Sequence, residues 1–150
     1  MGKKAKKKNK KKGRGQNAAK VRLSLCLIAR DEAEFLDRCL ESVRGVVDEI
    51  VVVDTGSVDE TVRVAQRHGA RIFSQPRQDD FSLARNRAIE AARGKWVLVL
   101  DCDEVIAHRD HQGIAVAMAQ ADVDGFRLTT RNYTDEENRA GWGACDDSYA

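Results

Sequence analysis

Short runs of apolar residues alternate along the chain with stretches in which apolar residues recur every three or four positions. The runs are rich in Val, Leu and Ile, as is typical of strands buried on both faces of a parallel sheet. They cover residues 21–29, 49–54, 71–74 and 96–100. The stretches between them have helical spacing and cover residues 35–43, 58–65 and 81–91. This alternation, with its short connections, predicts an α/β fold in which a mostly parallel sheet is flanked by helices.

Glycines and capping residues mark where the predicted helices begin and end. The three helices are each followed by a glycine, namely Gly45, Gly69 and Gly94. Ser57 and Glu60 have the spacing of a capping box, so we expect the second helix to open there with Val58 on its inner face. Later the pattern weakens, and it predicts a helix over residues 106–121 and a strand over residues 125–130.

Three of the predicted strands give way directly to polar residues. The first is followed by Arg30-Asp31-Glu32, the second ends in Asp54-Thr55-Gly56-Ser57, and the fourth is followed by Asp101-Cys102-Asp103. Because the carboxyl ends of parallel strands lie along one edge of a sheet, we expect these three segments to share that edge. Ligands of open α/β sheets bind in the crevice at this edge, so the sequence predicts a binding site there.

The acids after the fourth strand have the pattern of a metal site. If the chain stays extended, Asp101 and Asp103 point to one side and Cys102 points to the other. Two carboxylates placed in this way offer the oxygen ligands that Mg²⁺ and Mn²⁺ prefer. The structural alternative is that Asp101 ends the strand and Asp103 starts the next helix. The position at the end of a buried strand favours the metal site.

The same edge suits a nucleotide diphosphate. Gly56 lets the backbone approach a ligand closely. A carboxylate at a strand end accepts hydrogen bonds from ribose hydroxyls or from a base N–H. A divalent ion would neutralise the diphosphate and stabilise it as a leaving group. The chain contains no GxGxxG, which argues against a dinucleotide cofactor, and no P-loop consensus.

Composition divides the chain into a basic tail and an acidic body. At 150 residues it can form one domain with a buried core. Residues 1–20 hold ten of the 26 basic residues and no acidic one, whereas the rest has 16 basic against 24 acidic residues, a net charge of −8. The tail has too few apolar residues to order itself. Its charge would attract anionic lipid or nucleic acid, or it is only a solvated extension; the lack of aromatic residues argues against base stacking.

The sequence predicts neither export nor a membrane span. The apolar run after the tail leads into Arg30-Asp31-Glu32 without a small-residue cleavage site, and no segment approaches the length of a span. Cysteines occur at positions 26, 39, 102 and 145 without CxxC spacing, which favours reduced thiols over a disulfide frame or a zinc site. We therefore expect a cytoplasmic protein, with residues 1–20 contacting at most the inner face of the membrane.

Four sequence segments occur in a recognisable order. They are SLCLIARDE at residues 24–32, VVDTGSVDET at 52–61, DFSLARN at 80–86 and VLDCDE at 99–104. Together they resemble family 2 glycosyltransferases of the GT-A fold, and in particular the branch that contains lipopolysaccharide-core glucosyltransferases and peptide S-glycosyltransferases. A single DxD would be a weak signal, whereas this ordered set is specific.

The resemblance implies an inverting transfer of a hexose from a nucleotide sugar, usually a UDP-sugar, with Mg²⁺ or Mn²⁺. The acceptor would be a glycan, a lipid-linked molecule or a peptide. Carried over by position, the residues that bind the nucleotide sugar are Arg30, Asp31, Glu32, Asp54, Gly56, Ser57, Arg85, Asn86 and Asp101. Asp101 and Asp103 match the DxD metal ligands, with Asp103 as the direct one, and Cys102 replaces the alanine that is more frequent between them. Asp54 would contact the base or the ribose.

The catalytic base cannot be assigned from the sequence. In the family it lies in a later segment with the acceptor site, and no segment of this chain aligns with it. We therefore expect an N-terminal fragment: a tail over residues 1–20, a nucleotide-sugar-binding domain over 21–134 and an irregular, truncated end over 135–150. An alternative function is a fragment that binds a nucleotide sugar without turning it over. A nucleotidyltransferase should carry a glycine-rich basic loop where this chain has Arg30-Asp31-Glu32, which argues against that class.

Overall fold

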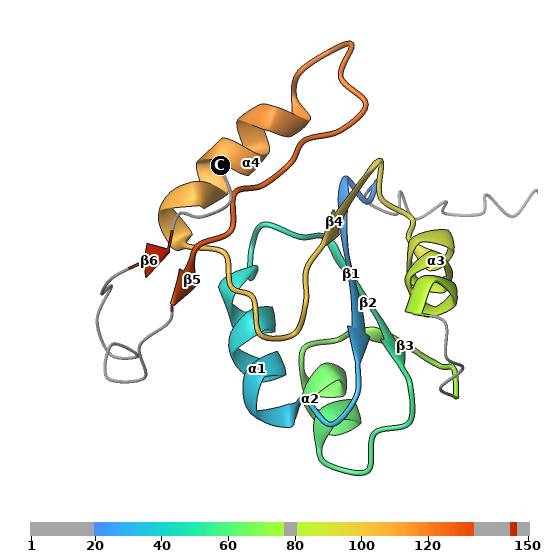
Figure 1. The fold of residues 1–150 in the computed structure, drawn as a ribbon. Coiled ribbons are helices and arrows are strands. Elements are labelled where there is room, and N and C mark those ends of the chain that lie inside the picture. Colours follow the sequence, from blue (N-terminus) through green and yellow to red (C-terminus); the bar gives the residue numbers. More distant parts are fainter. Residues whose placement is uncertain (1–19, 77–80, 134–144, 147–150) are drawn as a thin grey trace, which may run out of the picture. The chain divides into compact units, whose positions relative to one another are not determined.

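The computed structural model describes residues 20–76, 81–133 and 145–146 (Figure 1). The chain separates into two compact units, residues 1–108 and 109–150. The strands of the first unit are β1 (Leu23–Ala29), β2 (Glu49–Asp54), β3 (Arg71–Ser74) and β4 (Trp96–Val99), and its helices are α1 (Ala33–Ser42), α2 (Thr61–Arg67) and α3 (Phe81–Ala91). After the 3₁₀ helix η1 (His108–Asp110), the second unit contains α4 (His111–Met118), β5 (Asn132–Tyr133) and β6 (Cys145–Asp146).

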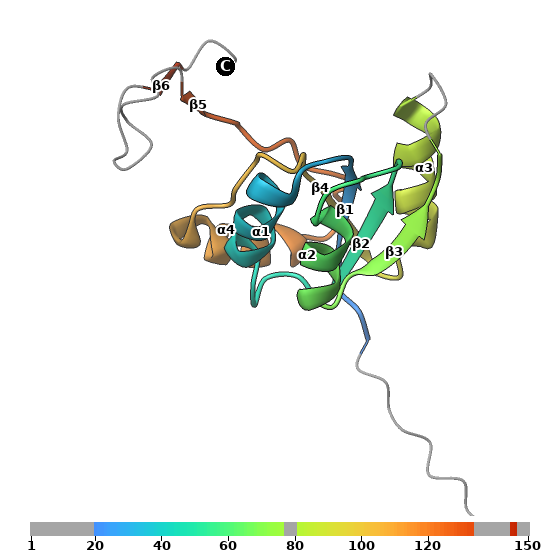
Figure 2. The ribbon, with the colours of Figure 1, turned by 90° about the horizontal axis from the view of Figure 1, so that it is seen from below.

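The strands of the first unit form one parallel sheet in the order β3-β2-β1-β4. Cys26 in β1 is level with Val51 in β2 and with Val99 in β4. Helices α1 and α2 cover one face of the sheet and α3 covers the other, as Figure 1 and Figure 2 show from two directions. The predicted α/β fold, with a parallel sheet flanked by helices, is therefore confirmed.

The core lies on both faces of the two central strands. On one face, β1 contributes Leu25 and Leu27, and α1 contributes Leu36 and Leu40, all fully buried. On the other face, a small cluster joins Cys26, Val51 and Val53 of the strands to Ala84 and Ala88 of α3. The alanines allow α3 to approach the sheet closely, and burial of this apolar surface is the main driving force that holds the layers together.

Strand β4 differs from the prediction of a strand buried on both faces. It ends at Val99, and among the described strands it pairs with β1 alone. Val97 and Val99 are 36% and 42% exposed, whereas Leu98 is buried. Helix α3 packs mainly on β1 and β2, so it covers the Val97 and Val99 side of β4 less than it covers those two strands. An apolar run identifies a strand but does not identify the neighbours of that strand.

Helix α2 begins later than the sequence predicts. Its first residue is Thr61, and the preceding Glu60 makes no side-chain capping bond to it. The expected capping box is wrong because the Ser57 hydroxyl accepts a hydrogen bond from the amide of Asp31 instead. Val58, expected on the inner face of the helix, is 93% exposed in the preceding loop. A tertiary hydrogen bond has replaced the local one.

The predicted helix ends agree better with the structure. Helices α1 and α2 end at Ser42 and Arg67, and Gly45 and Gly69 follow with φ of 80° and 73°. This left-handed backbone is one that glycine adopts without a steric penalty.

A buried carboxylate joins the strands at the amino edge of the sheet. Glu49 accepts hydrogen bonds from Ser24 Oγ at 2.6 Å, from Arg71 Nη1 at 2.6 Å and from the amide of Arg93 at 2.8 Å. Ser24 Oγ in turn accepts from the amide of Gly94 at 2.9 Å. The network connects β1, β2 and β3 with the turn between α3 and β4, and it satisfies a charge that would otherwise be costly to bury.

The second unit has less regular structure than the sequence predicts. Helix α4 is shorter than the predicted helix over residues 106–121. Residues 125–130 form no strand, because no described segment pairs with them, whereas β5 and β6 form a short antiparallel pair. Most of the end expected to be irregular lies outside the described residues, and the proposed domain boundaries stay a prediction. Among the described residues no helix is long and apolar enough to cross a membrane.

Candidate donor-binding edge

The loops that follow β1 and β2 are joined by reciprocal hydrogen bonds at the carboxyl edge of the sheet. The Asp31 amide donates to Ser57 Oγ at 3.0 Å. In return, Asp31 Oδ1 accepts from the amides of Val58 at 2.7 Å and Asp59 at 3.3 Å. Asp31 has a φ of 54°, in the left-handed region that Asp tolerates better than most residues do. The first two predicted segments therefore meet at one edge of the sheet.

The second loop and the first residue of α2 also cap helix α1. The amide of Glu32 donates to Thr61 Oγ1 at 2.8 Å, and the amide of Ala33 donates to Asp59 Oδ2 at 3.1 Å. Glu32, the N-cap residue, makes no capping bond with its own side chain. The amides at the start of a helix often bind a ligand anion. Here protein oxygens already occupy two of them, so an anion at this edge needs another source of positive charge.

Asp54 shapes the loop after β2. Its Oδ2 accepts from the amide of Gly56 at 3.2 Å and its Oδ1 accepts from the amide of Ser57 at 3.2 Å. Gly56 has a φ of 108°, which favours glycine. The residue is buried, and its carboxylate faces the loop amides. A contact between Asp54 and the base or ribose stays a prediction, and in this structure its side chain preorganises the loop.

The segment after β4 forms a turn and does not continue the strand. The amide of Asp101 donates to Glu104 Oε2 at 2.9 Å, and the amide of Glu104 donates to the carbonyl of Asp101 at 3.1 Å. Asp101 and Asp103 are exposed, whereas Cys102 is buried. The predicted division between outward acids and an inward cysteine therefore holds, but a turn produces it.

Two buried thiols fix this turn to the rest of the unit. Cys102 Sγ donates to the carbonyl of Ile28 in β1 at 3.2 Å, and Cys39 Sγ of α1 donates to the carbonyl of Asp101 at 3.7 Å. Burial raises the pKa of each thiol to about 12, and the nearby carboxylates act in the same direction. Both thiols are therefore protonated donors at neutral pH. An alanine at position 102 could not make the bond to Ile28.

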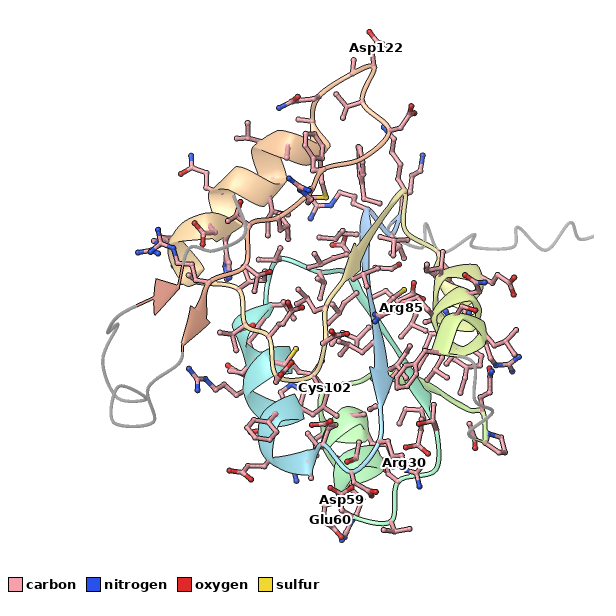
Figure 3. The ribbon with its side chains drawn as sticks, in the orientation of Figure 1. Arg30, Asp59, Glu60, Arg85, Cys102 and Asp122 are labelled. Atoms are coloured by element: carbon pink, nitrogen blue, oxygen red, sulfur yellow. The ribbon has the colours of Figure 1, made fainter. Side chains whose placement is uncertain are left out.

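Arg85 connects helix α3 to the turn. Its Nη2 donates to Asp101 Oδ1 at 2.9 Å. The side chain of Arg85 is 31% exposed and that of Asp101 is 67% exposed. Arg85 Nη1 is buried and has no hydrogen-bond partner in the part of the chain that the structure describes. Figure 3 shows Arg85 extending from α3 toward the sheet. Asn86, the next residue of α3, is exposed.

Negative charge is concentrated along this edge. Burial raises the pKa of Glu32, and the charges of Asp103, Asp59 and Asp31 raise it further. In Figure 3, Arg30 and Asp59 lie together at the carboxyl edge. Arg30 Nε lies 3.9 Å from Asp31 Oδ2, and the two side chains are 44% and 41% exposed, so this pair offsets little of the charge. A cation bound at the edge would relieve the repulsion.

The carboxylate oxygens at this edge fit a Mg²⁺ or Mn²⁺ ion that binds together with a diphosphate. Asp101 and Asp103 present exposed carboxylates on one short turn. Within the described ranges no three His, Cys, Asp or Glu side chains are grouped as a ready-made metal site. Mg²⁺ commonly takes one or two carboxylates and completes its shell with water and substrate phosphates. Two carboxylates therefore suffice for a metal that arrives with its nucleotide.

An open surface pocket lies elsewhere in the first unit. Its volume is about 560 Å³, and its lining includes Glu49 and Arg71, where strands begin, and Gly45 and Gly69, where helices end. It is therefore at the amino edge of the sheet, opposite the strand-end acids. The predicted site residues lie on an open edge and not in this pocket.

Three residues that support the site through hydrogen bonds were not predicted from the sequence. Thr61 and Cys39 bond across to another loop, and Glu104 closes the turn. Only Glu104 had a usable sequence signal, because an acid three residues after Asp101 has the spacing to accept its amide. The contacts of Thr61 and Cys39 join residues far apart in the sequence, so no local pattern could reveal them.

Known proteins resemble this chain in sequence and in structure. The family model described as glycosyl transferase family 2 matches residues 24–145. A TPR repeat-containing protein of Synechococcus elongatus is 56% identical over 87 residues, which cover 58% of this chain and 22% of that protein. The SPbeta prophage-derived glycosyltransferase SunS of Bacillus subtilis is 32% identical over 91 residues, covering 59% of this chain and 22% of SunS. The chain thus spans about a fifth of the length of these relatives.

A solved structure shares the fold. Glucosyl-3-phosphoglycerate synthase from Mycobacterium tuberculosis, crystallised in complex with uridine diphosphate, superposes with a TM-score of 0.52 and 26% identity. The match covers 67% of this chain and 41% of the synthase. The parallel sheet with helices on both faces is therefore also found in a synthase that was crystallised with uridine diphosphate.

Proposed function

The chain belongs to glycosyl transferase family 2, and we propose that it binds a UDP-sugar as the donor part of an enzyme that transfers a hexose with inversion. The observation that carries the proposal is the carboxyl edge, where the loop of Asp31, the loop of Asp54 and the turn of Asp101 and Asp103 are held by defined hydrogen bonds. The uridine diphosphate in the related synthase supports a uridine nucleotide as the ligand. The GT-A fold supports it as well.

The nucleoside would lie against the first two loops. The Asp31 and Asp54 carboxylates hold these loops by accepting hydrogen bonds from backbone amides, so the backbone there would need little further ordering when a ligand binds. Gly56, with its φ of 108°, would let the base or ribose approach the backbone closely, and Arg30 and Glu32 would lie beside the nucleotide. Ser57 and Asn86 complete the proposed contacts with the nucleotide sugar.

Asp101 and Asp103 would hold Mg²⁺ or Mn²⁺, with Asp103 as the direct ligand. The bound ion would neutralise the diphosphate as it leaves. The Asp103 carboxylate is exposed and therefore open to a metal ion, and its charge adds to the burial that raises the pKa of Glu32. Both carboxylates lie on the short turn that the bond from the Asp101 amide to Glu104 closes.

The acceptor would attack the anomeric carbon from the side opposite the diphosphate. We propose a glycan, a lipid-linked molecule or a peptide as the acceptor, and a base from a segment that the resemblance does not cover. The second candidate function is a nucleotide-sugar-binding module without turnover. It is favoured by the exposure of Asp101 and Asp103, because two exposed carboxylates can hold a metal with its diphosphate without any acceptor site.

Calorimetric titration tests the donor site. UDP and UDP-glucose are titrated into the chain with and without Mn²⁺, and Asp103→Ala is compared with Glu90→Ala, an exposed acid on α3. We expect Mn²⁺-dependent binding that falls about tenfold or more in Asp103→Ala and is unchanged in Glu90→Ala. A folded native chain that binds neither nucleotide would contradict the proposal. A transfer or hydrolysis assay on the binding-competent chain then separates an enzyme from a binding module.

The location and the tail belong to the same proposal. Three cysteines of the described chain are free thiols, which agrees with a cytoplasmic location. We further propose that residues 1–20 contact anionic membrane lipids through their ten basic side chains. Co-flotation with vesicles containing phosphatidylserine should be lost on deletion of residues 1–20, while UDP binding stays unchanged.

A further inference from the structure

Arg85 forms an ion pair with a carboxylate that the proposed metal site needs. Its Nη2 donates to Asp101 Oδ1 at 2.9 Å, and Asp101 is one of the two acids of the turn. A carboxylate oxygen that faces a guanidinium at this distance presents less negative charge to an approaching cation. Arg85 and a divalent ion are therefore competing partners of Asp101.

The arrangement of Arg85 favours its release from Asp101. The ion pair is partly exposed, since 31% of the Arg85 side chain and 67% of the Asp101 side chain are open to solvent, so breaking it costs little. The other terminal nitrogen, Nη1, is buried without a partner in the described part of the chain. A buried donor with no acceptor is unfavourable, so movement of the guanidinium toward a new acceptor would be favoured.

A diphosphate would provide that acceptor. Two of the first amides of α1 are already bonded to Thr61 and Asp59, so they are not open to phosphate oxygens. Planar guanidinium groups bind phosphate through bidentate hydrogen bonds to two of its oxygens. Among the residues described at this edge, Arg85 is the cation directly bonded to the turn that carries the acids.

We propose that Arg85 exchanges partners: without a ligand it pairs with Asp101, and when the nucleotide arrives with its metal it releases Asp101 to the metal and pairs with the diphosphate. The proposal rests on the proposed function, because it assumes that Asp101 and Asp103 form the metal site. It adds that metal and nucleotide binding are coupled through one side chain. Metal alone would bind weakly, since it must displace Arg85 without providing a new partner for it.

Opposite changes in two affinities test the exchange. Mn²⁺ alone is titrated by electron paramagnetic resonance, and UDP is titrated by calorimetry at saturating Mn²⁺. In Arg85→Gln we expect Mn²⁺ alone to bind about three- to fivefold more tightly, because its competitor is gone. UDP should bind about tenfold or more weakly, because the phosphate has lost a charged partner. Arg85→Met, which keeps the length of the stem, should show the same two changes.

The matched control is Arg87→Gln. Arg87 lies on the same helix, and its guanidinium is 5.5 Å from the ring centre of Phe73 in β3. Its replacement should leave both affinities as in the native chain. Circular dichroism checks that each variant is folded, and a variant that does not fold is replaced in the comparison by the other Arg85 variant.

Two other results have distinct meanings. If the native chain binds Mn²⁺ and UDP but both Arg85 variants bind Mn²⁺ alone equally or more weakly, Arg85 positions Asp101 for the metal and the exchange is overturned. The proposed function then stands. If the native chain binds neither Mn²⁺ nor UDP, the proposed function fails, and the exchange fails with it.

Discussion

Gly94 lies so close to Ser24 that no side chain fits between them. A Cβ on Gly94 would be 2.7 Å from the backbone nitrogen of Ser24, 2.8 Å from Ser24 Oγ and 2.6 Å from the carbonyl oxygen of Trp96. The Gly94 amide also donates to Ser24 Oγ at 2.9 Å. The turn therefore cannot move away without losing a bond in the network of Glu49.

Replacing Gly94 with Ala should destabilise the first unit. The neighbours that the new methyl group meets are mostly backbone atoms, which cannot move aside cheaply. We expect a loss of about 2 kcal/mol in the free energy of unfolding, the usual cost of overpacking. Urea unfolding followed by circular dichroism measures it. Gly113→Ala is the control, because nothing lies within 4 Å of its Cβ and Ala favours a helix interior, so it should cause no loss.

The carboxylate of Glu49 should make stability depend on pH. Burial alone raises the pKa of Glu49, but hydrogen bonds from Ser24, Arg93 and Arg71, with the charge of Arg71, outweigh it and lower the pKa below its ordinary value of 4.5. The unfolded chain thus takes up the proton first as the pH falls. The stabilisation is present above pH 4.5 and is lost as the pH drops through the lower folded-state pKa.

Glu49→Gln tests this dependence. At pH 7 the variant should lose about 3 kcal/mol in the free energy of unfolding, because Arg71 and the Ser24 hydroxyl lose a charged partner. The gap between native and variant should narrow in acid as native Glu49 is protonated. Urea unfolding at pH 7 and pH 3 measures both values, and Glu41→Gln, an exposed acid, is the control. A gap that is equal at the two pH values would contradict the assignment.

The sequence alone predicts where the strands of the sheet lie, but it predicts poorly which elements pack or pair with each strand. Strands such as residues 49–54 and 71–74 are correct to the residue, because apolar runs and turn residues are local signals. The burial of β4 is wrong because it depends on which elements pack beside it. The strand over residues 125–130 is not formed because a strand also needs a partner, which periodicity does not specify.

The candidate site also has a part that the sequence predicts and a part that it does not predict. The acids at the strand ends could be predicted, since a parallel sheet must bring its carboxyl ends to one edge. Their supporting bonds could not be predicted. Ser57 fits a local capping box in sequence, yet its hydroxyl serves Asp31, 26 positions earlier. Hydrogen bonds of this kind depend on the assembled fold and leave no periodic trace in the chain.

The three described thiols should resist modification in the folded chain. Burial raises the pKa of Cys26 to about 11 and that of Cys39 and Cys102 to about 12, so almost none is thiolate at pH 8. In a Cys145→Ser background, we expect no reaction with Ellman's reagent until urea unfolds the chain. Absorbance at pH 8 with and without urea measures it. Rapid reaction of even one thiol without urea would contradict this prediction, because it would show that the packing around that thiol opens readily in the folded chain.

Asp31 provides the sharpest test of the joined loops, because two replacements separate its roles. Asn keeps an Oδ1 that accepts the amides of Val58 and Asp59, and it tolerates the φ of 54°. Ala keeps neither property. We expect Asp31→Ala to lose about 2 kcal/mol in the free energy of unfolding and Asp31→Asn to lose less than about 0.5 kcal/mol.

The same pair of variants connects loop order to ligand binding. If the loops must be joined before a nucleotide binds, Asp31→Ala should weaken UDP binding by about tenfold, since the ligand must then order both loops, and Asp31→Asn should bind nearly as well as the native chain. If Asp31 instead contacts the ligand through its charge, Asn and Ala should weaken binding equally while only Ala loses stability. Calorimetric titration of UDP at saturating Mn²⁺, combined with urea unfolding of each variant, distinguishes the two roles.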